Sequence, residues 1–356
     1  MKKGFVVAAL LAASLSVHAQ TGLVMYGRLN LDLEYIHANG DFPNVTRLSS
    51  NSSRLGVRGT ESLGGGNYAL FQLEASVAAD AGGGNPAGRD TFVGLTGAWG
   101  TLKFGYFLAP YDDMHPLFGN DPTLTTSILA TSSIWANGFA PKGVGGFDDR
   151  LPNSIRYDTP NFNGLFGGVQ VALAENPPAH GYVLSMAATY INGPFVGGIA
   201  YERNKDVRAK GLDDWAFTAT AAWDFGFARV AALYERLDYE TFTGPLKRNL
   251  YGASMTASAA NGTFYAVWIH GADGKGGGSR VAGLLSGPDT SADQWEVSYT
   301  YAFSKRVVAY AGYVRLDNER NAGYTFNINA YLPRGIVPPL VGMRLNGYVL
   351  GLVHYF

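Results

Sequence analysis

A strict alternation of apolar and polar residues runs through most of the chain and limits the folds open to it. The clearest case is residues 23–35, LVMYGRLNLDLEY, where Leu29 and Leu33 share one face and Arg28 and Asp32 share the other. A period of two predicts β-strands, because successive side chains of a strand point to opposite faces. After residue 20, no stretch approaches the roughly 18 apolar residues that a membrane-spanning helix needs. The pattern therefore predicts an all-β chain.

Sixteen segments with this period follow one another, and their connections alternate in length. Short connections such as SLGGG, GAWG and NFNG alternate with longer polar or glycine-rich ones. A soluble sandwich, with its polar faces in water and its apolar faces against a core, would explain a single segment. An even strand number with short turns at one end and long loops at the other is typical of an outer-membrane barrel, in which closure pairs every backbone group. We therefore predict a sixteen-stranded antiparallel transmembrane β-barrel.

The two ends of the chain fit an exported barrel. Residues 1–19 begin with Lys2 and Lys3, continue through an apolar run too short to span a bilayer, and end at the small residue Ala19. This order predicts a signal peptide, which leaves residues 20–356 as the barrel. The tail NGYVLGLVHYF also alternates, and we expect the ring of Phe356 to lie in the aromatic girdle at the periplasmic interface.

The composition agrees with this interpretation and excludes some partners. The 47 glycines and the 13% of aromatic residues suit strands joined by tight turns. The chain has no cysteine, so its stability comes from packing and backbone hydrogen bonds rather than disulfides. The 27 basic residues, two of them in the leader, face 28 acidic ones. This slightly negative balance argues against nucleic acid as a partner.

Five blocks of the sequence resemble a known family. They are MYGRLNL, SSRLGVRGTESLGGGNYALFQLEA, RDTFVGLTGAWGTLKFG, NSIRYDTPNFNGL and the terminal Phe356. From about residue 22 to residue 356 the chain resembles the Gram-negative general porins, above all the trimeric sixteen-stranded porins of betaproteobacteria. The resemblance implies a homotrimer in the outer membrane, surrounded by lipid, that passes ions and small hydrophilic solutes without a cofactor or covalent chemistry. It also implies that the outer-membrane assembly machinery reads the terminal aromatic residue.

The resemblance further implies a pore constriction. In such porins the third long loop folds into the barrel and presents acidic residues opposite a ladder of arginines. Here that loop corresponds to residues 107–152, and the motif PYDDMHPLFGND lies within it. The candidate acids are Asp112, Asp113 and Asp121, and the candidate basic residues are Arg28, Arg54, Arg89 and Arg150, with Arg58 in second rank.

Residue patterns support this placement independently. A long loop can instead be a disordered external lid, but apolar residues such as Phe118 and Trp135 favour a loop packed inside. Arg28 and Arg54 lie opposite the apolar residues of their strands, and an arginine on the lipid face costs about 2–4 kcal/mol at the bilayer midplane. The family often carries an arginine directly after KFG; here the residue is Tyr106, with Lys103 as partial compensation.

We therefore predict a passive diffusion channel with a mild anion preference, because four arginines face at most three acids and fixed charges at a constriction control ion entry. The alternatives are a substrate-specific channel, a barrel enzyme or an adhesin. No GxSxG motif supports a hydrolase, and GKGGGS around Lys275 lacks the order of a phosphate-binding loop. The histidines lie far apart without ligand spacing, so no metal site is expected; outside the leader they are His37, His115, His180, His270 and His354.

Overall fold

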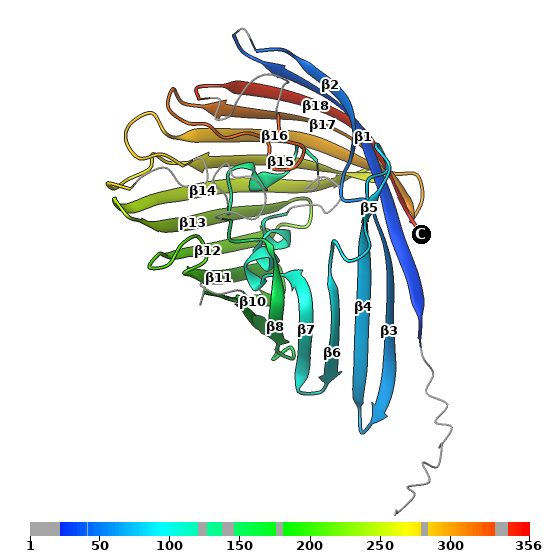
Figure 1. The fold of residues 1–356 in the computed structure, drawn as a ribbon. Helices are drawn as coiled ribbons and strands as arrows, with labels where there is room; N and C mark the ends of the chain where they lie inside the picture. The colour runs from blue at the N-terminus through cyan, green and yellow to red at the C-terminus, as the bar shows by residue number, and fades with distance from the viewer. Residues whose placement is uncertain are drawn as a thin grey trace, which may run out of the picture.

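One antiparallel sheet contains almost all of the regular structure. The computed structural model describes residues 22–40, 42–119, 127–136, 146–175, 181–278, 284–331 and 341–356. Within these ranges no helix is long and apolar enough to cross a membrane. The strands (Figure 1) are β1 (Val24–Ala38), β2 (Val45–Ser50), β3 (Arg54–Gly64), β4 (Asn67–Val77), β5 (Gly84–Asn85), β6 (Thr91–Gly97), β7 (Gly100–Leu108), β8 (Arg150–Asp158), β9 (Leu165–Leu173), β10 (Tyr182–Asn192), β11 (Phe195–Lys205), β12 (Asp213–Asp224), β13 (Arg229–Thr241), β14 (Gly244–Ala259), β15 (Gly262–Gly271), β16 (Ala292–Ala302), β17 (Val307–Asn318) and β18 (Arg344–Tyr355).

The sheet closes into a barrel because its first strand pairs with its last. The β1–β18 register runs from Arg28 opposite Tyr355 to Ala38 opposite Leu345. Strands β2 and β3 both pair with β1 and act as two parts of one strand, whereas β5 has only two residues. Counted in this way, sixteen strands surround the part of the barrel that the structure describes, which confirms the predicted number. Strand β2 is not apparent from the sequence pattern.

The two faces of the strands differ as the alternation predicts. In β1, Leu29 and Leu33 are 40% and 52% exposed on the outside, whereas Arg28 and Glu34 are 1% and 0% exposed inside. An apolar exterior suits hydrocarbon, and a polar interior suits a water-filled lumen. The inner side of β1 is nevertheless packed rather than open to solvent, because loops fill part of the lumen.

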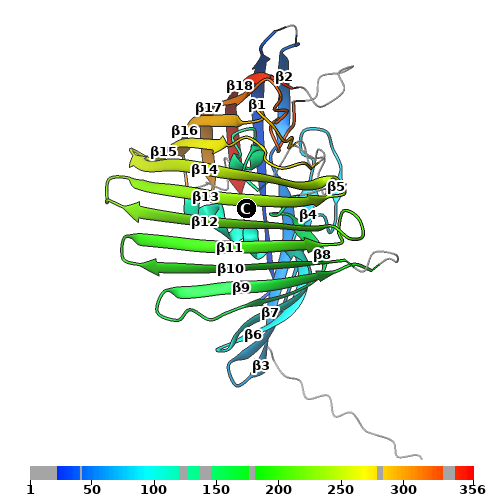
Figure 2. The same ribbon diagram turned by 90° about the vertical axis from the view of Figure 1, so that its left-hand side faces the viewer.

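Turns and loops segregate to opposite ends of the barrel. The turn between β3 and β4 contains Gly64, Gly65 and Gly66, all at positive φ, a conformation that glycine adopts without strain. The opposite end carries the longer connections, with one correction to the prediction. Strand β13 ends at Thr241 and strand β14 starts at Gly244, so the hairpin that joins them is tight although it lies at the loop end. Figure 2 shows this hairpin within the run of neighbouring strands from β9 to β14.

The third long connection, residues 109–149 and here called loop 3, lies inside the barrel in its described parts (Figure 1). It contains three short 3₁₀ helices: η1 (Pro110–Met114), η2 (Pro116–Phe118) and η3 (Thr131–Ser133). The first two contact the inner wall formed by β9 to β13. Tyr111, Phe118 and Trp135 are fully buried. The inward loop expected from its apolar content is therefore present, with limits slightly narrower than the predicted 107–152.

Candidate pore constriction

Four of the predicted arginines gather on one wall of the barrel. Arg28 belongs to β1, Arg54 begins β3, Arg89 precedes β6 and Arg150 begins β8. Arg54 interacts electrostatically with Arg28 and Arg150, and Arg89 interacts with Arg54 and Arg150. These four residues are called the arginine wall below. Their grouping follows from inward parity on strands that neighbour one another around the barrel.

Two acids outside the predicted set form ion pairs with these arginines. Glu74, on β4 and 6% exposed, has one carboxylate oxygen 2.5 Å from Arg89 Nε and the other 3.9 Å from Arg54 Nε. Asp90 Oδ1 accepts a hydrogen bond of 2.6 Å from Arg150 Nε. Among the described residues, the four guanidinium groups of the arginine wall thus have ion pairs with two carboxylates, and Arg150 also interacts electrostatically with Asp112, so positive charge is in excess.

The second-rank candidate lies apart from this group. The guanidinium carbon of Arg58 is 4.9 Å from the centre of the Tyr26 ring. Arg58 pairs across the sheet with Val24, four residues along β3 from Arg54 toward the short-turn end. Lys103 does not supply a free charge in place of the missing family arginine, because its Nζ is 2.9 Å from Asp158 Oδ2.

The predicted loop acids have different surroundings from one another. Asp113 Oδ2 accepts a hydrogen bond of 2.6 Å from Arg156 Nη2, and Arg156 Nε also bonds Asp158 at 2.7 Å. Arg156, on β8, was not among the predicted residues, although its parity opposite Ile155 points it inward. Asp112 instead lies beside His115 and Asp148, within loop 3 itself. Asp121 lies outside the described residues.

The described parts of a second loop also enter the lumen, which the sequence pattern did not indicate. Residues 319–343, here called loop 8, connect β17 to β18. Asn329 Nδ2 donates to Glu34 on β1 at 2.8 Å, and Arg47 Nη1 on β2 donates to the carbonyl oxygen of Ala330 at 3.0 Å. Asn327 Nδ2 reaches Ser132 of loop 3 at 3.2 Å. The two loops therefore narrow the barrel together.

The aromatic residues of loop 8 are the sequence feature that would have predicted its position inside the barrel. Tyr324, Phe326 and Tyr331 are 1%, 0% and 0% exposed. Large aromatic side chains in a long connection are as unfavourable in water as those of loop 3, so the same reasoning applied to both loops would have placed both inside.

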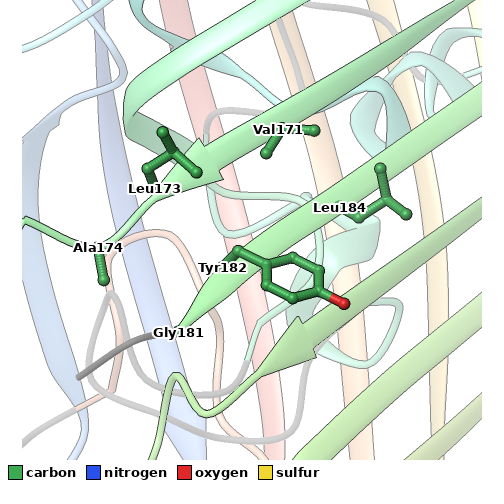
Figure 3. Close-up of a pocket in the computed structure, with 6 residues that line it drawn as sticks. All are labelled: Val171, Leu173, Ala174, Gly181, Tyr182 and Leu184. Carbon is green, nitrogen blue, oxygen red and sulfur yellow. The ribbon is translucent and has the colours of Figure 1, made fainter.

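A shallow depression on the outer face lies away from this chemistry. It is formed by the end of β9 and the start of β10, and Figure 3 shows the aliphatic side chains of Val171, Leu173 and Leu184 along it. The alternating neighbour Ser185 points inward, where its Oγ accepts a hydrogen bond from the backbone N–H of Tyr111. By parity, the depression faces the membrane side and plays no part in the pore.

Comparisons with known proteins agree with the barrel. The family described as Gram-negative porin matches residues 6–321. Outer membrane porin protein 32 of Delftia acidovorans is 28% identical over 374 residues and covers all of both chains. Major outer membrane protein P.IB of Neisseria meningitidis serogroup B is 33% identical over 225 residues, which cover 58% of this chain and 61% of that one.

Solved structures give the same result. The anion-selective porin from Comamonas acidovorans has a TM-score of 0.76 and 25% identity, covering 94% of this chain and 100% of that one. The trimer form of OmpT from Vibrio cholerae, at a TM-score of 0.68 and 15% identity over 94% of this chain and 99% of that one, shares the fold. The chain belongs to the Gram-negative porins, the channel-forming β-barrel proteins of the outer membrane.

Proposed function

We propose that this outer-membrane diffusion channel prefers anions mildly, and that the arginine wall sets the preference. The observation that carries the proposal is the charge of that wall. Among the described residues, its four guanidinium groups form ion pairs with two carboxylates, Glu74 and Asp90, and Arg150 also interacts electrostatically with Asp112. Asp113, the described loop acid that reaches β8, is already paired with Arg156. Fixed charges act strongly in a narrow passage because little water screens them. Similarity to a porin described as anion-selective supports the same sign.

Substitution within the arginine wall tests this proposal. We expect the double variant Arg54→Ala and Arg89→Ala to move the reversal potential under a salt gradient toward cation preference, because it removes two positive charges from the constriction. Arg306→Ala is the control, since Arg306 is exposed in the turn between β16 and β17, and its reversal potential should stay at the wild-type value. A double variant with normal conductance and an unchanged reversal potential would show that these arginines do not set the selectivity.

A substrate-selective channel is the second candidate, and loop 8 is the observation that favours it. The bonds from Asn329 to Glu34 and from Arg47 to Ala330 hold that loop against the adjacent strands β1 and β2, and Asn327 contacts Ser132 of loop 3. Recordings on single channels separate the two functions. Large steps proportional to voltage and salt favour general diffusion, whereas flux that saturates with one solute favours selectivity.

The assembly state and the processing of the chain are part of the same proposal. We expect a homotrimer, released by heat to monomers on gels, in agreement with the trimer form of a related fold. We also expect the mature protein to begin at Gln20 after removal of residues 1–19, a point that N-terminal sequencing decides. Lipid, diffusing solutes and the assembly machinery are the other partners.

A further inference from the structure

A histidine and two carboxylates from opposite limbs of loop 3 meet inside the barrel. Asp112 lies in η1 and His115 directly follows it, while Asp148 lies two residues before β8. One oxygen of each aspartate and one ring nitrogen of His115 all lie within 4.8 Å of one another. His115 Nε2 is 3.1 Å from Asp148 Oδ2. The histidine spacing in the sequence gave no sign of this group, because a single histidine contributes to it.

Packing holds the imidazole in place. The ring centroids of His115 and Trp135 are 3.9 Å apart, and Trp135 is fully buried. The side chains of His115 and Asp148 are 9% and 10% exposed, so they are largely shielded from solvent but not sealed. A shell of this kind fixes the direction of the ring nitrogens and limits the water around them, as it does around metal sites.

Negative charge exceeds positive charge around this group. Glu235 of β13 and Glu202 of β11 are 0% and 1% exposed, and one carboxylate oxygen of each lacks a hydrogen-bond partner in the described part of the chain. Glu235 interacts electrostatically with His115, and Glu202 interacts with Asp148. Burial of an unpaired carboxylate oxygen is costly, and a nearby cation would offset that cost.

The neighbouring guanidinium groups make their hydrogen bonds outside this group, although Arg248 interacts electrostatically with Glu235 and Arg150 with Asp112. Arg248 donates to Tyr324 and to the carbonyl oxygen of Ile134, and Arg150 is paired with Asp90. With His115 charged, three positive charges, those of His115, Arg150 and Arg248, face five carboxylates, those of Asp90, Asp112, Asp148, Glu202 and Glu235.

The ligand types indicate which cation fits. Imidazole nitrogen together with carboxylate oxygen is a donor set for first-row divalent metals, and Zn²⁺ accepts both at about 2.0–2.2 Å. Tetrahedral geometry at these bond lengths separates neighbouring ligand atoms by about 3.3 Å, close to the present spacing of His115 and Asp148. We propose that Asp112, His115 and Asp148 form a binding site for a divalent transition-metal cation, with Zn²⁺ as the best-fitting ion and water as its remaining ligand.

Such an ion would join the two limbs of loop 3. It would hold η1 against the segment that leads into β8, and would add two positive charges inside the lumen. We expect bound Zn²⁺ to quieten fluctuations of the open-channel current and to strengthen the anion preference. Binding itself does not depend on the proposed selectivity, so titration tests the site even if that selectivity is wrong.

The test uses the folded full-length mature protein without a histidine tag. Isothermal titration with ZnCl₂ should show one site per chain. His115→Gln and Asp148→Asn should each weaken Zn²⁺ binding by at least ~10–100-fold, the range already found when residues around metal ligands are changed. Mg²⁺ should not compete, because it prefers all-oxygen octahedral sites. Zn²⁺ anomalous diffraction should place the ion between the two limbs.

A second histidine–aspartate pair provides the matched control. His270 Nδ1 is 3.1 Å from Asp293 Oδ1 on the barrel wall, outside the loop 3 group. His270→Asn should leave Zn²⁺ affinity unchanged. Asp112→Asn, which keeps the side-chain shape, provides a further ligand variant if either of the others fails to show heat-modifiable gel mobility. The proposal is overturned if the wild type does not bind Zn²⁺, if the loop variants bind it as tightly as the wild type, or if the ion lies elsewhere.

Discussion

At the scale of single residues, Glu74 controls how much of the arginine wall's charge reaches the lumen. Its two carboxylate oxygens face Arg54 and Arg89, and its side chain is 8% exposed. Replacing it with glutamine removes one negative charge and keeps the side-chain size. We therefore expect Glu74→Gln to increase the anion preference, opposite in sign to the double arginine variant, as measured by the reversal potential in planar bilayers.

Glu61 provides the control for this change. It is an exposed acid near the end of β3, away from the arginine wall. Glu61→Gln removes the same charge from the chain and should leave the reversal potential unchanged. Equal shifts from both variants would mean that total charge, rather than the charge at the constriction, sets the selectivity.

The same residues show what parity can and cannot predict. Alternation with apolar residues predicts that Arg28 and Arg54 point inward. Glu74 alternates with Leu73 in the same way, so its inward direction can also be predicted from the sequence. The position of Asp148 cannot be predicted in this way, because its place beside Asp112 depends on how a 41-residue loop returns through the lumen. Local alternation fixes the direction of a strand side chain, whereas only tertiary packing fixes that of a loop side chain.

At the scale of elements, loop 8 should limit conductance. Arg47 links Glu34 on β1 to the carbonyl oxygen of Ala330, and its salt bridge with Glu34 measures 2.6 Å. We expect Arg47→Ala to loosen the loop and raise the single-channel conductance. Arg320→Ala is the control, since Arg320 is exposed in the same loop and pairs with Asp289. Unchanged conductance in folded Arg47→Ala channels would show that loop 8 does not narrow the pore.

The closing strand depends on its terminal aromatic residue. Backbone groups of Phe356 and Gly27 exchange hydrogen bonds of 3.0 and 3.1 Å, and a Cβ on Gly27 would lie 2.5 Å from the Phe356 ring. The ring thus packs over β1 where the barrel closes. We expect Phe356→Asp to reduce the yield of folded barrels, read as heat-modifiable mobility on gels.

A second aromatic residue at the same end of the barrel provides the control. It distinguishes the role of Phe356 in closing the barrel from the role of the aromatic girdle as a whole. Phe227 lies in the connection between β12 and β13 and is 78% exposed. Phe227→Asp should fold in near-normal yield, because it does not lie at the closing seam. An equal loss of folded barrels in the two variants would mean that the aromatic girdle, and not the terminal position of Phe356, causes the effect.

At the scale of the whole molecule, strand number and closure were predictable because the period-two pattern survives in every spanning strand. The irregular parts of the barrel were not. Strand β2 is not evident in the sequence because residues 51–53 interrupt the strand that it shares with β3. The position of loop 8 is not evident because alternation does not determine the course of a connection. A barrel wall is encoded locally, residue by residue, whereas the contents of its lumen depend on contacts between segments far apart in the chain.

The salt dependence of the ion preference distinguishes the electric field of the constriction from the field of the whole protein. The chain carries a formal net charge of −1, which would favour cations weakly if the exterior governed entry. Screening lengths fall from about 8 Å at physiological ionic strength to about 3 Å at 1 M, and charges in a narrow passage are screened less than charges on exposed loops. We therefore expect anion preference at low salt that decreases, without changing sign, as salt rises. A cation preference that grows on dilution would mean that the exterior charge governs entry and that the arginine wall does not.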